Sequence, residues 1–170
     1  MAYWRMQLHP DDSTFSSFYA YQSIAKGFIG LGFANENIGD LLELDDISKL
    51  GKQSVYLPFA TQMQKDDIVL IMSHNNPLAV VKVNGNYNYI RETLPELGVW
   101  FNHFRTIDKN GIIYYSDVVT NVKAQESIPM TNTISSLSEE TQSYQLIKQM
   151  VQWDKSHNPE TIYANYFNSH

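Results

Sequence analysis

The chain has 170 residues, a formal net charge of −6 and no cysteine. This length supports one buried core rather than two full domains. The charge argues against a general polyanion binder, because sequence-independent affinity for nucleic acid comes from clustered Lys and Arg. The absence of cysteine excludes disulfides and thiolate chemistry. No apolar run approaches the ~20 residues of a membrane span and residues 1–10 lack a signal-peptide pattern, so we expect a cytoplasmic protein.

The first predicted elements are a strand and a helix. Residues 3–8, YWRMQL, have the pattern of a strand, which Pro10 ends because proline cannot donate to a sheet ladder. Ser13 is the expected N-cap of a helix that runs to about residue 26, and Gly27 supplies its stop.

Aromatic residues recur at helical spacing in this first helix. Phe15, Phe18 and Tyr19 share one face, so we expect that face to pack against the sheet. Residues 28–33, FIGLGF, then read as a second strand whose glycines allow close approach of another backbone or a ligand. Residues 37–63 have the pattern of a broken helical segment.

The centre of the chain has the pattern of a β-hairpin. Residues 68–72 and 78–83 are short, apolar and rich in β-branched side chains, and a polar loop joins them. Such strands are typically buried on both faces, in the floor of a closed sheet. The loop, residues 73–76, is then expected at the rim of the sheet, where a ligand can reach it.

A second hairpin is predicted further along. Residues 87–90 are extended, and residues 99–107, VWFNHFRTI, form a strand with two different faces. Asp108 to Gly111 reads as a tight turn into residues 112–119, so we expect these last two strands to pair. One face of the strand at 99–107 carries four residues that we expect to lie together: Trp100, Asn102, Phe104 and Thr106.

The C-terminal part reads as a strap followed by helices. Residues 123–137 are rich in Ser, Thr and Asn, which is typical of a loop. Ser138 is the expected cap of a helix, and Asn158-Pro159 is expected to begin another short one. The first of these helices carries an apolar stripe of Tyr144, Ile147, Met150 and Val151. Six or so strands with one early helix favour an α+β fold with a small, strongly curved sheet or barrel.

No enzyme motif emerges from the sequence. The five histidines show no HExxH spacing, no GxSxG elbow is present, and the phosphate-binding GxxxxGK[ST] loop is missing. Gly30 and Gly32 resemble the start of a dinucleotide-binding turn, but Asn35 stands at the third glycine position. We therefore predict a binding domain with no catalytic residue, metal or cofactor.

What remains is a set of residues suited to binding a flipped base. A base needs flat apolar walls, since stacking contributes roughly 1 to 3 kcal/mol per base against a few kcal/mol of unstacking. The predicted walls are Trp4, Phe33, Trp100 and Phe104. The predicted readers of the base edge are Ser73, His74, Asn75 and Asn102. The predicted phosphate contacts are Arg5, Lys82 and Arg105.

Several of these residues also have a purely structural interpretation. Trp4 can equally be a core residue. Trp100 and Phe104 lie on one strand face, so we expect both to be in the core or both to line the pocket. Arg105 can simply pair with an acidic neighbour, and His74 can do no more than close its turn.

These residues together resemble a known family. YWRMQL at 3–8, GFIGLGF at 27–33 and the Gly-Asp-Leu at 39–41 look like the opening of EVE-type domains of the PUA-like superfamily, relatives of the YTH readers of methylated RNA. The segments at 66–90 and 99–107 are similar to the N-terminal reader of McrB-type subunits of modification-dependent restriction systems.

The resemblance implies a PUA-like pseudo-barrel of about six strands with flanking helices. Residues 1–122 would form the base-reading domain, and residues 123–170 a strap and C-terminal helices packed on it. The implied partner is double-stranded DNA carrying a modified base, with methylation as the expected modification. An AAA+ GTPase domain in the full-length chain and a separate nuclease subunit are implied as well. An RNA reader of the same fold and a protein-interaction domain without a nucleic-acid ligand are the alternatives.

Overall fold

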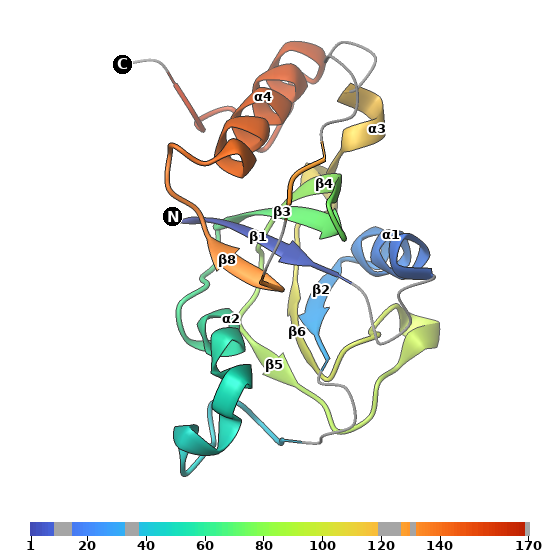
Figure 1. Cartoon of the computed structure of the whole chain (residues 1–170). Coiled ribbons are helices and arrows are strands. Elements are labelled where there is room, and N and C mark those ends of the chain that lie inside the picture. The colour runs from blue at the N-terminus through green and yellow to red at the C-terminus, as the bar shows by residue number, and fades with distance from the viewer. Residues whose placement is uncertain (9–14, 33–37, 119–126, 130–131, 169–170) are drawn as a thin grey trace.

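The computed structural model describes residues 1–8, 15–32, 38–118, 127–129 and 132–168. It shows a mixed α+β protein with a five-stranded and a three-stranded sheet (Figure 1). Three features predicted from the sequence lie outside the described residues: the cap at Ser13, the pocket wall at Phe33 and the domain boundary at 122–123. Beyond that boundary, β8 (Ile134–Ser136) is a strand of the five-stranded sheet, and α4 (Gln142–His157) packs against that sheet.

The five-stranded sheet has the order β7-β4-β3-β1-β8. Its other strands are β1 (Tyr3–Gln7), β3 (Ile68–Ser73), β4 (Asn76–Lys82) and β7 (Ile113–Tyr114). β1 runs parallel to β3, and every other pair in this sheet is antiparallel. The predicted first strand and central hairpin are therefore confirmed.

The middle of this sheet is buried on both faces, as the continuous apolar run of β3 predicts. Successive side chains of a strand point to opposite faces. Val69 and Ile71 face the three-stranded sheet and α1 (Ser16–Lys26), whereas Leu70 and Met72 face α4. Figure 1 shows α4 on one side of the sheet and α1 with β2 and β6 on the other.

The three-stranded sheet has the order β2-β6-β5. Its strands are β2 (Phe28–Leu31), β5 (Asn88–Tyr89) and β6 (His103–Thr106). A bridge between Val83 and Ile107 joins the end of β4 to the end of β6, so the two sheets meet at one corner. The described strands do not close into a barrel, and the pseudo-barrel stays a prediction.

The predicted hairpin between residues 99–107 and 112–119 is wrong. β6 lies between β2 and β5, so both of its edges are already paired. The short helix η4 (Lys109–Gly111) redirects the chain, and β7 pairs with the open edge of β4 instead. The strand then ends at Tyr114, where α3 (Tyr115–Val118) begins.

The aromatic face of α1 does not pack against the sheet, contrary to the expectation from its spacing. Phe15, at the N-cap, and Phe18 are 55% and 56% exposed. The buried face instead carries mostly small residues, which let the helix lie close to the strands: Ser16, Ala20, Ser23 and Ile24. The predicted stop at Gly27 is confirmed, with a φ of 95° in the left-handed region.

Short helical segments lie between the strands along the chain. The broken helical pattern corresponds to η2 (Ile47–Tyr56) and α2 (Leu57–Thr61), and η3 (Pro95–Leu97) precedes β6. Asp46 caps η2, because its carboxylate accepts a hydrogen bond from the Ser48 backbone N–H at 3.0 Å.

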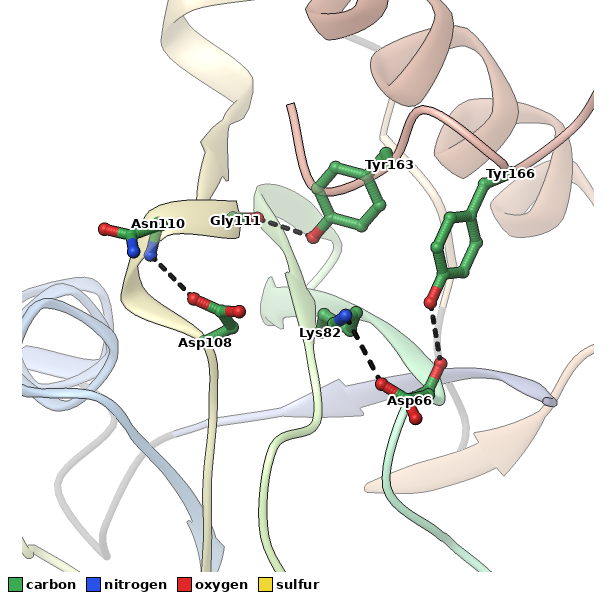
Figure 2. Close-up of polar contacts among 7 residues, drawn as sticks. All are labelled: Asp66, Lys82, Asp108, Asn110, Gly111, Tyr163 and Tyr166. Atoms are coloured by element: carbon green, nitrogen blue, oxygen red, sulfur yellow. Dashed lines mark hydrogen bonds and ion pairs between the residues drawn. The ribbon is translucent and has the colours of Figure 1, made fainter. Parts of the chain in front are cut away.

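The C-terminal helix α4 buries all four residues of its predicted stripe. Its cap is Thr141 rather than the predicted Ser138, since the Thr141 hydroxyl accepts from the Tyr144 backbone N–H. No helix begins at Asn158, where the chain continues in turns. Tyr163 is fully buried there and donates to the Gly111 carbonyl, so the last turns are fastened to η4 (Figure 2). Side-chain packing rather than helical geometry orders this end.

Candidate functional site

Trp4 lies in the core rather than at a pocket wall. Its side chain is 3% exposed, and its indole N–H donates to a carboxylate oxygen of Asp67 at 2.9 Å. The same carboxylate accepts from the backbone N–H groups of Ala2 at 2.6 Å and Gln64 at 2.9 Å. Trp4 and Asp67 therefore tie the start of β1 to the start of β3, and we remove Trp4 from the candidate site.

Arg105 is also an interior residue, so its predicted contact with phosphate is corrected. Its guanidinium donates to the carbonyls of Phe59 at 2.9 Å, Gly85 at 3.1 Å and Ala60 at 3.2 Å. It also lies 5.6 Å from the centroid of the Phe59 ring, and burial lowers its pKa. Arg105 joins α2 to β6 through backbone carbonyls.

The structure does not bring the other predicted phosphate contacts together. Lys82 lies 3.3 Å from Asp66 at the end of β4 (Figure 2). Arg5 lies on β1, where it donates to the Pro129 carbonyl at 3.4 Å and the Ser143 hydroxyl at 3.3 Å. Both cations are therefore engaged within the fold, at separate places.

The predicted rim loop between β3 and β4 is only partly accessible. Ser73 is 2% exposed, and its hydroxyl is 2.6 Å from that of Ser16 and 3.0 Å from that of Ser17, which anchors α1 to the end of β3. His74 and Asn75 are exposed at the turn, and His74 has a φ of 52°. These two residues are at the rim, whereas Ser73 is structural.

The predicted face of Trp100, Asn102 and Phe104 is half-buried. The Asn102 amide donates to the carbonyls of Ile90 at 3.1 Å and Arg91 at 3.0 Å, so it braces the loop after β5. The Phe104 ring packs edge-on against Phe28, with centroids 5.7 Å apart. Of these residues, Trp100 has the environment best suited to a ligand.

Four aromatic residues, which we call the aromatic cluster, lie together with Tyr19 at their centre: Phe15, Phe18, Tyr19 and Trp100. The Tyr19 ring contacts the other three, with centroid distances of 4.7 Å to Trp100, 5.7 Å to Phe18 and 6.4 Å to Phe15. Trp100 is half-buried, and its Nε1 is covered yet has no hydrogen-bond acceptor within the described part of the chain. The cluster thus combines exposed ring surface with an unmet donor.

A second helical pattern in α1 indicates which face of the helix is buried. It is less conspicuous in the sequence than the aromatic pattern. Residues 16, 20, 23 and 24 of α1 also recur at helical spacing, and they are smaller than the aromatic set. A helix that lies against a two-sided sheet buries its small face most closely. Phe15 and Phe18 are then left exposed, and the half-buried Tyr19 lies between them and Trp100.

A series of buried hydrogen bonds links Leu41, Tyr87 and His103 of β6. The Tyr87 hydroxyl accepts from the Leu41 backbone N–H at 3.0 Å and lies 2.7 Å from Nδ1 of His103. Burial lowers the pKa of His103 to about 4, so the imidazole is neutral near pH 7. These hydrogen bonds hold the interior of the fold together rather than facing a ligand, since His103 is 2% exposed.

Comparison with known proteins assigns no family. No family model matches the chain, and no curated protein matches it. In the described ranges, no helix has the length and apolar character to cross a membrane, and no three His, Cys, Asp or Glu side chains gather as metal ligands. The candidate site therefore rests on the geometry of the aromatic cluster and on the sequence motifs.

Proposed function

We propose that this chain is a DNA-binding specificity module that recognises a modified, methylated base by taking it out of the duplex and stacking it on the aromatic cluster. The observation that carries the proposal is the exposed ring surface of Phe15 and Phe18, which Tyr19 connects to Trp100 and its unmet indole N–H. Stacking on such rings contributes roughly 1 to 3 kcal/mol per base, comparable to the cost of unstacking it.

The indole N–H of Trp100 gives the cluster a means of reading a base edge. A buried donor without an acceptor costs about 1 to 3 kcal/mol. Base edges carry carbonyl oxygens and ring nitrogens that accept hydrogen bonds. A base that displaces the atoms covering Trp100 Nε1 satisfies this donor, and a methyl group adds on the order of 1 kcal/mol from apolar burial. The small total makes the geometry of the cluster decisive.

Phosphate contacts have a minor part in this proposal. Arg105 is buried, and Lys82 and Arg5 are engaged at separate places. The net charge of −6 also opposes approach to DNA. The logarithm of the association constant should therefore fall only weakly with the logarithm of the salt concentration, with a slope of about −2 or shallower.

The resemblance to EVE-type and McrB-type readers supports the proposal from the sequence side. Its residues at 3–7 and 28–31 form β1 and β2, and those at 68–82 form the β3–β4 hairpin. A PUA-like pseudo-barrel, a downstream AAA+ GTPase domain and a separate nuclease subunit belong to the same proposal. In such a system this chain selects the DNA, and the other parts act on it.

Fluorescence anisotropy with short labelled duplexes tests the proposal. Duplexes that carry 5-methylcytosine or N6-methyladenine are compared with unmodified duplex at fixed salt. We expect at least one modified duplex to bind about tenfold more tightly than the unmodified one. Equal binding to all duplexes, or no binding, contradicts the proposal.

Two matched variants connect that result to the aromatic cluster. Phe18 and Ile47 are both 56% exposed, but Ile47 lies in η2, outside the cluster. Phe18→Ala should weaken binding to the preferred duplex about fivefold or more, through lost stacking, whereas Ile47→Ala should leave it unchanged. Equal affinities for the two variants would remove the cluster from the binding site.

A protein-interaction domain is the second candidate function. The core position of Trp4 and the negative charge favour it. An RNA reader is separated by including methylated single-stranded RNA in the anisotropy series, since the 2′-hydroxyl allows a site to discriminate. Tighter binding to that RNA than to any duplex favours the RNA reader, and no binding to either nucleic acid favours the interaction domain.

A further inference from the structure

A cavity of about 630 Å³ lies between α2, the loop that joins β4 to β5, and β6. This volume is typical of sites for small molecules, which have about 300 to 1,000 Å³. Two cations, Lys65 and Arg105, are in its wall, and no acidic side chain is among the described residues that line it. The cavity wall is therefore positive, although the chain as a whole has a net charge of −6. It shares no residue with the aromatic cluster.

Arg105 lines this cavity with a guanidinium that the fold already holds in place. Each of its three nitrogens donates to a backbone carbonyl, those of Phe59, Gly85 and Ala60. A guanidinium has five N–H groups, so one N–H on each terminal nitrogen has no acceptor within the described part of the chain. The group is ordered before a ligand arrives, which reduces the entropic cost of binding.

The positive charge of Arg105 has no direct counter-ion. The side chain is 3% exposed and forms no ion pair within the described ranges. Burial lowers its pKa, and the charge of Asp67 raises it by less. The Asp67 carboxylate instead accepts hydrogen bonds from three N–H groups of the fold. Because a buried charge costs free energy unless it is paired, an anion in the cavity would stabilise Arg105.

The other walls offer a second cation, neutral donors and apolar surface. Lys65 is exposed, and its ammonium has no partner among the described residues. The side-chain amides of Gln64 and Asn86 can donate further hydrogen bonds to an anion. Leu42 and the ring of Tyr87 give the body of an organic molecule an apolar surface.

We propose that this cavity binds the carboxylate or phosphate group of a small organic molecule, held by the guanidinium of Arg105 and the ammonium of Lys65. Both groups present two or more oxygens that match the planar fork of a guanidinium, which distinguishes them from a single-point anion such as chloride. The ligand is a small molecule rather than a DNA backbone, because a guanidinium that is 3% exposed lies too deep for a duplex.

NMR of the arginine Nε–H signals at constant ionic strength tests the proposal. The Nε–H of Arg105 donates to the Phe59 carbonyl and is buried, so it exchanges slowly with water and gives an observable signal. Replacing the other two arginines, Arg5 and Arg91, by lysine one at a time assigns the signals.

Three ligands of similar shape are titrated: benzoate, phenyl phosphate and the neutral benzamide. We expect a saturable shift of the Arg105 signal with at least one of the two anions and none with benzamide at equal concentration. Equal responses to benzamide and the anions, or no saturable shift with either anion, overturn the proposal.

Two substitutions in the wall, each with a matched control, locate the anion. Lys65→Gln removes a cation and should weaken binding of the preferred anion about fivefold, and Gln64→Glu adds a carboxylate and should weaken it about tenfold. Lys148→Gln and Gln149→Glu make the same changes on α4, across the five-stranded sheet from β6, and should leave binding unchanged (Figure 1).

Thermal unfolding midpoints verify that the four variants are folded. If Lys65→Gln and Gln64→Glu bind the anion as tightly as their controls on α4, the anion is held elsewhere and the proposal fails. The relative affinities of the two anions then identify the ligand group. Tighter binding of benzoate indicates a carboxylate ligand, and tighter binding of phenyl phosphate indicates a phosphate ester.

Discussion

Trp4 and Trp100 are the same residue type in two opposite environments. Trp4 is 3% exposed, and its indole N–H has a carboxylate acceptor in Asp67. Trp100 is half-buried, its Nε1 has no acceptor within the described part of the chain, and its neighbour Tyr19 leads to two exposed phenylalanines. Trp4 is held by a satisfied hydrogen bond, whereas Trp100 is distinguished by its exposed aromatic neighbours, because the covered Nε1 of Trp153 also lacks an acceptor among the described residues.

The largest expected loss of stability follows from removing Asp67, the hydrogen-bond partner of Trp4. Asp67→Ala leaves three donors without their acceptor, on Ala2, Trp4 and Gln64. The Trp4 donor is buried and the other two are partly buried. A buried donor without an acceptor costs about 1 to 3 kcal/mol, so the free energy of unfolding should fall by about 4 kcal/mol. Urea denaturation followed by circular dichroism measures it.

The neighbouring Asp66 provides the matched control. Its side chain is 53% exposed and, among the described residues, forms an ion pair with Lys82 alone. Asp66→Asn keeps a residue that tolerates the φ of 73° and should cost at most about 1 kcal/mol. Similar losses for the two variants would contradict the structural role assigned to Asp67.

Arg105, which was predicted from the sequence to contact phosphate, is like Trp4 a buried residue with satisfied hydrogen bonds. Arg105→Met removes the donors to three carbonyls while keeping most of the side-chain volume. We expect a loss of about 3 kcal/mol in the free energy of unfolding. The salt dependence of duplex binding should not change, and a shallower slope in the folded variant would restore Arg105 as a phosphate contact.

The buried His103 on β6 predicts a pH dependence of stability. Its pKa is about 4 in the folded protein and about 6.5 in an unfolded chain. Between these values the unfolded chain binds a proton that the folded protein does not, so stability is complete above pH 6.5 and falls as the pH drops. The contribution is about 1.4 kcal/mol per pH unit, or about 3 kcal/mol in total.

Denaturation of the wild type and His103→Gln at several pH values isolates this contribution, because carboxylates titrate similarly in both. The variant should show a flatter decline between pH 6.5 and 4.5. Parallel curves for the two proteins would mean that His103 takes up its proton without unfolding.

Replacing each tryptophan separately by phenylalanine should give the smallest losses of stability, and the two losses should differ clearly. Trp4→Phe removes one of the three donors to Asp67 and some core volume, and should cost about 2 kcal/mol. Trp100→Phe removes a donor that has no acceptor in the described ranges, and should cost less than about 1 kcal/mol. Urea denaturation decides, and a larger loss for Trp100→Phe would reverse the comparison.

The sequence predicts those elements whose residues are determined by local pattern. The β3–β4 hairpin follows from two apolar runs around a polar turn, and the end of α1 follows from Gly27. The pairing of β7 does not follow, because it depends on which strand edges other elements leave open. β5 and β2 occupy both edges of β6, and neither fact is encoded near residue 112.

The candidate site is harder to predict than the fold. The sequence names Trp100 but cannot separate it from Trp4 and Arg105, because the partners of those two lie far along the chain, at Asp67 and Phe59. Satisfied hydrogen bonds distinguish these residues, and they become visible only in three dimensions. For the same reason helical spacing alone places Phe18 against the sheet, although it is 56% exposed.

The fluorescence of Trp100 during titration with a modified duplex tests the central claim most directly. Trp153→Phe leaves Trp4 and Trp100 as the emitting tryptophans. Because a stacked base quenches an indole, we predict saturable quenching with the modified duplex, and none when Trp100→Phe is added to the Trp153→Phe protein. Unchanged emission at saturating duplex, or equal quenching without Trp100, would contradict the claim that the aromatic cluster receives the base.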